Sequence, residues 1–74
     1  MDNLCRRELQ VLTLLANGYE AKEIARELSI SFYTIKNYKR LILLKLQALN
    51  TSHAIAIAFK KNILSKENIL EGKD

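Results

Sequence analysis

The stretch of sequence that decides the fold runs from residue 21 to residue 46 and reads AKEIARELSISFYTIKNYKRLILLKL. It contains two segments in which apolar residues recur with helical spacing, residues 21–28 and residues 32–46. The short connection between them ends at Ser31, and serine is a residue type favoured as a helix N-cap. Two helices joined by so tight a connection are typical of a helix-turn-helix.

The second of these predicted helices has two contrasting faces. With about 100° between successive residues, one side collects positions that should face the core, namely Ile35, Tyr38, Ile42, Leu46 and Leu49. The opposite side carries a polar and basic row at i, i+3, i+4 and i+7, formed by Tyr33, Lys36, Asn37 and Arg40. Leu44 continues this outer row, so we expect it to be exposed.

A first helix is predicted over residues 6–16. It is followed by Asn17-Gly18, and glycine just past a helix end is the usual left-handed cap. Cys5 stands at the N-cap with Glu8 three residues later, a near-capping box in which cysteine replaces Ser or Thr. We expect Glu8 to order the fold, by capping this helix or by pairing with a nearby lysine or arginine.

A fourth helix is predicted over residues 52–61, because Asn50-Thr51-Ser52 supplies several possible caps. One of its sides should present Ile55, Ala58, Phe59 and Asn62, and the other His53, Ile57 and Lys60. The domain is expected to span residues 1–64. Residues 65–74 should form a charged tail that frays, docked loosely by Ile69 and Leu70.

The composition fits this all-α, four-helix prediction. A chain of 74 residues allows one domain, and 49% hydrophobic with 27% charged residues indicates a globular chain. With no proline and two glycines, long helices are favoured over strands joined by tight turns. Twelve basic residues against eight acidic ones give a net charge of +4, which suits a polyanion such as DNA or a merely soluble basic protein.

Several other classes of protein are disfavoured. The single cysteine, Cys5, allows no internal disulfide and no structural zinc site, and we interpret it as an inert replacement at a cap. His53 lacks a partner carboxylate or a second ligand, so a surface or interface role is expected. No catalytic arrangement, phosphate-cradling loop, signal peptide or membrane-length apolar run is visible. We expect a cytoplasmic protein that is not an enzyme and uses no cofactor, metal or small-molecule ligand.

The outer row of the helix over residues 32–46 has the chemistry of a DNA reader. An α-helix fits the major groove, where Lys36 and Arg40 can donate to guanine O6 and N7 and Asn37 can both donate to and accept from adenine. Ser31 and Thr34 can bind a phosphate together with free backbone N–H groups at the helix start. Further contacts to the DNA backbone are predicted for Lys22, Lys39 and, through stacking, Tyr33.

The chain also resembles the LuxR/GerE-type regulators. Residues 4–12 (LCRRELQVL) are similar to the opening of that domain, and Asn17-Gly18 with residues 22–28 (KEIAREL) to its second helix. Ile30-Ser31 with residues 34–37 (TIKN) and Lys45-Leu46 resemble its third helix, and Ala54-Ile55 its fourth. The likeness covers about residues 4–64 without a gap. A chain beginning at Met1 and ending shortly past this region is similar to members that are this domain alone, although a longer parent with a receiver or sensory domain stays open.

This resemblance implies a four-helix domain that binds double-stranded DNA as a homodimer in the bacterial cytosol or nucleoid. The matching positions in the family place Lys36, Asn37 and Arg40 near bases, and Lys22, Thr34 and Tyr38 near phosphates. The fourth helix would make the dimer contact, for which the expected residues are His53, Ala54, Ile57 and Lys61.

Some positions depart from the family pattern. The family's usual histidine is Tyr38 here, a commonly apolar position is Lys39, and Thr51 stands in place of an arginine. Leu41 and Leu44 occupy positions where polar residues are commoner. These two leucines motivate the alternative of a protein-interaction module, in which the helix-turn-helix scaffold binds an RNA polymerase subunit or another regulator.

Overall fold

The computed structural model describes residues 3–70, which form four α-helices and one short 3₁₀ helix. The α-helices are α1 (Arg6–Ala16), α2 (Ala21–Leu28), α3 (Phe32–Leu46) and α4 (Thr51–Lys60), and the 3₁₀ helix is η1 (Lys66–Asn68). The predicted bounds of the first three helices are confirmed. The fourth lies one residue earlier than predicted, because Asn50 supplies the cap by accepting from the backbone N–H of His53 at 2.8 Å.

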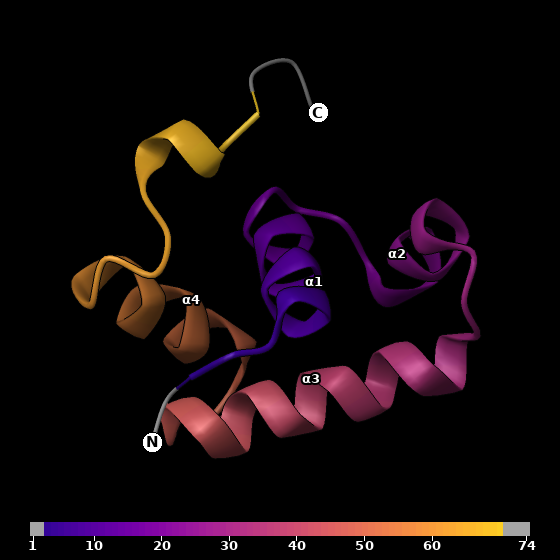
Figure 1. Cartoon of the computed structure of the whole chain (residues 1–74), viewed down its shortest axis with the longest axis horizontal. Coiled ribbons are helices and arrows are strands. Elements are labelled where there is room, and N and C mark those ends of the chain that lie inside the picture. The colour runs from indigo at the N-terminus through magenta and orange to yellow at the C-terminus, as the bar shows by residue number, and fades with distance from the viewer. Residues whose placement is uncertain (1–2, 71–74) are drawn as a thin grey trace.

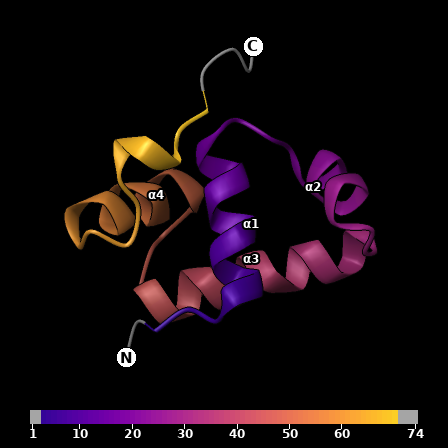
Figure 2. The same ribbon diagram turned by 45° about the horizontal axis from the view of Figure 1, so that its top comes forward.

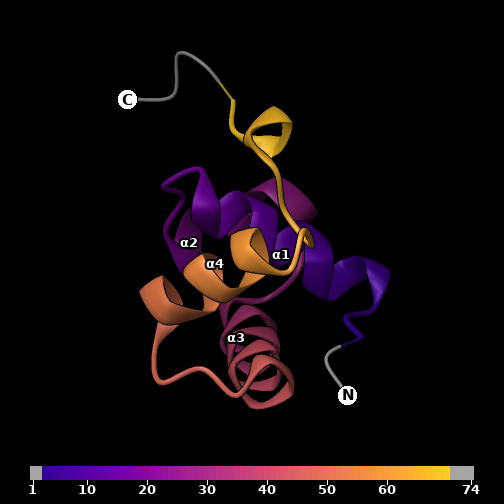
Figure 3. The ribbon, with the colours of Figure 1, turned by 90° about the vertical axis from the view of Figure 1, so that its left-hand side faces the viewer.

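Helix α1 lies at the centre of the domain and packs against each of the other three α-helices (Figure 1). Apolar residues from all four helices form one core, with Leu64 added after α4; these residues are Val11, Leu12, Ile24, Ala25, Ile35, Ile42, Leu46, Ala54, Ala58 and Leu64. Helix α3 runs along one edge of the molecule, with α1, α2 and α4 all on one side of it (Figures 1 and 3). The other side of α3 is therefore open.

The ends of the helices follow the local chemistry of the sequence. Gly18 has φ +87°, as expected of a left-handed residue just past α1. Ser29 closes α2 and Gln47 closes α3 in the same left-handed region, at φ 57° and 55°. The prediction for Leu49 is wrong because it extended the helical spacing of α3 past the end of the helix, which Gln47 closes. Leu49 lies beyond the helix and is 87% exposed instead of facing the core.

The predicted faces of α4 are partly wrong. Ala54 and Ala58, one turn apart, are the residues that α4 buries in the core. Ile57, expected on the outer side, is half-buried and packs against the core, while His53 and Lys60 are exposed as predicted. The fully buried residues of α4 are therefore small, and its larger apolar side chains are half-buried against the core.

The segment after α4 is docked rather than frayed over the residues that the structure describes. Leu64 is buried, and the Asn17 side chain donates to the carbonyl of Asn68 at 2.9 Å and accepts from the backbone N–H of Leu70. Figure 2 shows η1 beside α4 and near the end of α1. Ile69 and Leu70 remain exposed, so this docking is made by hydrogen bonds to Asn17. Residues 71–74 of the predicted tail lie outside the described residues.

No single helix within residues 3–70 has the length and composition needed to cross a membrane. Only α3 and α4 taken together, with a bend of 51° between them, pass that test of length and composition.

Candidate nucleic-acid interface

The turn between α2 and α3 is held by backbone hydrogen bonds at its start and by side chains at its end. The left-handed Ser29 lets the backbone N–H of Ile30 donate to the carbonyl of Ala25 at 3.0 Å. Ser31 then caps α3, because its Oγ accepts from the backbone N–H of Thr34 at 3.0 Å. The orientation of α3 relative to α2 is therefore fixed locally by the three residues between them.

The hydroxyl groups expected near a phosphate are close to each other. Ser31 Oγ and Thr34 Oγ1 lie 2.8 Å apart. Because Ser31 is the N-cap of α3, the pair lies at the positive end of the helix dipole. The backbone N–H of Thr34 is engaged by Ser31, which removes one of the free donors that we expected there. A phosphate at this position would meet the two hydroxyls and the remaining first-turn N–H groups.

The predicted outer row of α3 is exposed. Tyr33 is 78% exposed, and Lys36, Asn37 and Arg40 are also exposed along the same side of the helix. Tyr38 and Lys39 are half-buried beside this row, and Lys22 is exposed in the first turn of α2. The structure thus brings the three predicted base readers together on the open side of α3.

Two cations of this row have partners on their own helix. The Lys36 ammonium lies 5.6 Å from the centre of the Phe32 ring, within the range of a cation–π contact. Arg40 Nη2 donates to Asn37 Oδ1 at 2.8 Å. We did not predict either pairing, although the spacings of four and three residues along a helix are the signals that could have indicated them.

The charged residues in the sequence stretch that contains this row are all basic. Helix α3 contains no acidic residue, and none occurs in the sequence between Glu27 and Glu67. The same stretch contains Lys36, Lys39, Arg40 and Lys45 on α3, followed by Lys60 and Lys61. A helix with this charge attracts a polyanion.

Lys45 has a structural role instead. Its ammonium donates to the Glu8 carboxylate at 2.8 Å and joins α3 to α1. Burial raises the pKa of Glu8, but the hydrogen bonds from Lys45 and from the Cys5 backbone N–H outweigh burial, so its pKa lies below the ordinary value. The hydrogen bond to Glu8 also raises the pKa of Lys45. Both roles that we expected of Glu8 are confirmed, because it caps α1 through Cys5 at 2.9 Å and pairs with a lysine.

The residues predicted for a dimer contact differ in exposure. His53 and Lys61 are exposed and Ile57 is half-buried, whereas the Ala54 side chain, at 1% exposed, offers almost no surface to a partner. His53 has a further role, because its Nδ1 accepts from the backbone N–H of Leu49 at 3.0 Å and so links the first turn of α4 to the segment before it.

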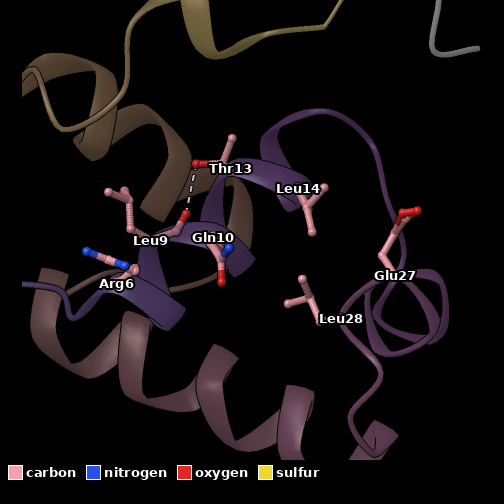
Figure 4. Close-up of a pocket in the computed structure, with 7 residues that line it drawn as sticks. All are labelled: Arg6, Leu9, Gln10, Thr13, Leu14, Glu27 and Leu28. Carbon is pink, nitrogen blue, oxygen red and sulfur yellow. Dashed lines mark hydrogen bonds between the residues drawn. The ribbon is translucent and has the colours of Figure 1, made fainter.

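A groove of about 420 Å³ lies between α1 and the end of α2 (Figure 4). Its wall is mainly apolar, with Leu9 and Leu14 on α1 and Leu28 on α2, and with Arg6 and Glu27 also among the lining residues. None of the predicted DNA or dimer contacts lines it. Within residues 3–70, no group of three or more His, Cys, Asp or Glu side chains is placed to hold a metal ion.

A tight two-helix turn with a capped, basic and exposed second helix defines a helix-turn-helix DNA-binding domain. Comparison with known families supports this class, because residues 2–58 match the family described as bacterial regulatory proteins, luxR family. The chain belongs to this family, whose domain binds DNA and regulates transcription.

Curated relatives agree with the family. The chain is 47% identical over 58 residues to the transcriptional regulatory protein DesR of Bacillus subtilis (strain 168), covering 78% of this chain and 29% of that protein. It is 39% identical over 61 residues to the oxygen regulatory protein NreC of Staphylococcus carnosus (strain TM300), covering 82% of this chain and 28% of that protein. The chain therefore spans less than a third of the length of these relatives. No solved structure matches it.

Proposed function

We propose that this domain binds duplex DNA sequence-specifically as a transcription regulator, with the first half of α3 in the major groove. The observation that carries this proposal is the exposed row of Lys36, Asn37 and Arg40 on the open side of α3, in a stretch of sequence without acidic residues. Lys22, Ser31, Tyr33, Thr34, Tyr38 and Lys39 flank this row and are proposed to contact the DNA backbone. The bacterial cytoplasm is the proposed location.

The proposal predicts that binding weakens steeply with salt, because each neutralised phosphate releases a counterion. Lys36→Ala should weaken binding to a preferred sequence by about 1–3 kcal/mol, whereas Lys22→Ala should weaken binding to all sequences and reduce the salt slope by roughly 1 for each lost contact. Gel-shift titrations over a range of salt concentrations measure both effects. Gln10→Ala, an exposed change on α1, is the control. Equal operator affinity for wild type and Lys36→Ala would contradict the assignment of α3.

Homodimerisation through α4 is part of the proposal. The exposed His53 and Lys61 and the half-buried Ile57 are the side chains that could reach a partner, while Ala54 is covered by the domain itself. Two-fold symmetry in the bound sequence, together with sedimentation of the complex, tests this step. A half-site bound by one chain per duplex would exclude it.

A second candidate function is a protein contact made by the same scaffold. Leu44 is 63% exposed at the far end of the outer row, and the half-buried Leu41 precedes it on α3. These side chains suit an apolar surface on an RNA polymerase subunit or on another regulator. If the chain retards no DNA at low salt but is retained by purified polymerase, this function replaces the first.

A further inference from the structure

The hydrogen bond between Arg40 and Asn37 restricts what the outer row of α3 can read. Arg40 Nη2 donates to Asn37 Oδ1 at 2.8 Å, and both side chains are exposed. A guanidinium group has donors and no acceptor, so the amide must turn its oxygen toward Arg40. The direction of the Asn37 amide is therefore set by its neighbour three residues later.

This pairing changes the role expected of Asn37. Reading adenine requires the asparagine to donate to N7 and to accept from the N6 amino group with its oxygen. Here the oxygen already accepts from Arg40, and an adenine amino group brought to its second lone pair would meet the guanidinium donors beside it. A contact to adenine by Asn37 is disfavoured as long as the pair stays together.

The same pairing leaves Arg40 able to read guanine. A guanidinium has two edges with two donors each, one formed by the two terminal nitrogens and one by Nε with Nη2. Because Asn37 uses one of the two hydrogens on Nη2, one of these edges stays complete whichever hydrogen is used. Guanine presents O6 and N7 as two acceptors that fit such an edge, and holding the long side chain in advance lowers the entropy lost on binding.

We infer that Asn37 is a positioning residue for Arg40, and that the pair acts as a single reader of guanine in the major groove. This inference rests on the proposed function, since it assigns a base to the same face of α3. Asn37 retains two N–H donors on Nδ2, which can reach an acceptor on a neighbouring base or a water. The specificity of the row then depends on the geometry of the pair.

Selection of bound duplexes from a random-sequence pool tests this inference with wild type, Arg40→Ala and Asn37→Ala. The wild type should select a guanine that Arg40→Ala no longer requires. Asn37→Ala should weaken the preference at that same base pair by about 5- to 100-fold, since a good bidentate contact discriminates to this extent. Asn37→Asp should retain the preference for guanine, because its carboxylate accepts from Arg40, while total affinity falls through the added negative charge.

The chain offers a matched control on α1. Arg7 Nη1 donates to Gln10 Oε1 at 3.2 Å with the same three-residue spacing, so Gln10→Ala removes an equivalent pair away from α3. It should select the wild-type sequence. The positions changed here on α3 and α1 are exposed, so the unfolding temperatures should stay within a few degrees of the wild type.

The alternative outcomes are distinct. If Asn37→Ala loses an adenine at a different base pair and keeps the guanine, Asn37 is an independent reader and the inference is wrong. It is also wrong if Asn37→Ala selects the wild-type sequence, or if Arg40→Ala loses no guanine. If the wild type itself selects no sequence, the proposed function fails and this inference fails with it.

Discussion

The two halves of α3 have the same inner row but different outer rows. On the inside, Ile35 in the first half and Ile42 and Leu46 in the second are all buried in the core. On the outside, the first half ends at Arg40 with a polar, basic row, whereas the second half exposes Leu44. The inner face of α3 is therefore apolar and buried in both halves, whereas its outer face changes from polar and basic to apolar halfway along.

The cations in the two halves of α3 also differ in their partners. In the first half, Lys36 and Arg40 contact side chains of α3 itself, so these contacts connect no other part of the fold. In the second half, Lys45 reaches Glu8 on α1 and links two helices. Changes to the exposed cations of the first half should therefore affect binding, whereas changes to Lys45 and to the buried residues of α3 should affect stability.

The largest expected effect is on stability, from Ile42→Ala in the second half. Ile42 is 1% exposed, and shortening a buried isoleucine removes apolar contacts and leaves a cavity. We expect the free energy of unfolding to fall by about 2–5 kcal/mol. Urea unfolding measures it, with Lys36→Ala as the control that should change stability by less than about 0.5 kcal/mol. If Ile42→Ala has the same free energy of unfolding as the wild type, the second half of α3 does not stabilise the fold in this way.

A smaller, pH-dependent effect is expected at the ion pair between α1 and α3. Lys45→Met leaves Glu8, whose side chain is 3% exposed, without its cation but with the hydrogen bond from the Cys5 backbone N–H, and should lower the free energy of unfolding near neutral pH by less than Ile42→Ala does. Because the pKa of Glu8 in the folded state is lowered, its stabilisation is complete above the ordinary value of 4.5 and is lost as the pH falls through the folded pKa.

Unfolding measured from pH 7 down to pH 2 checks this effect. Glu8→Gln should also be less stable than the wild type near neutral pH, and the difference should shrink at acidic pH, where Glu8 is protonated in both states. Lys36→Met removes a cation whose partner is the Phe32 ring and not a carboxylate. The pH dependence of its free energy of unfolding should therefore follow that of the wild type. A constant difference between wild type and Glu8→Gln over the whole range would contradict the coupling to ionisation.

The features that could be predicted from the sequence are local ones. The bounds of α1, α2 and α3 were predicted from a glycine after one helix, a serine before another and the apolar spacing between them. The outer row of α3 was predicted in the same way, because residues three and four apart on a helix share a face. The near-capping box of Cys5 and Glu8 also predicted that Glu8 would be structural, but not which cation would pair with it.

The features that could not be predicted from the sequence are contacts between residues far apart in the chain and hydrogen bonds between neighbouring side chains. Asn17 holds a segment more than fifty residues later in the chain, and no local pattern indicates that contact. Leu49 was misplaced because the helical spacing was extended three residues past Leu46, although the chain leaves the helix at the left-handed Gln47. The Arg40–Asn37 pair was missed because each residue was considered against a base and not against its neighbour.

The smallest expected effect is the one that decides how far the reading surface extends. Leu44 is 63% exposed, so Leu44→Gln should change the free energy of unfolding by less than about 0.5 kcal/mol. If the reader ends at Arg40, operator affinity should also stay within about twofold of the wild type, in contrast to Lys36→Ala. Gel-shift titration at a fixed salt concentration measures this difference. A clear loss of affinity confined to sites with a thymine at one position would mean that Leu44 contacts a thymine methyl group, and α3 would then read DNA along its whole outer row.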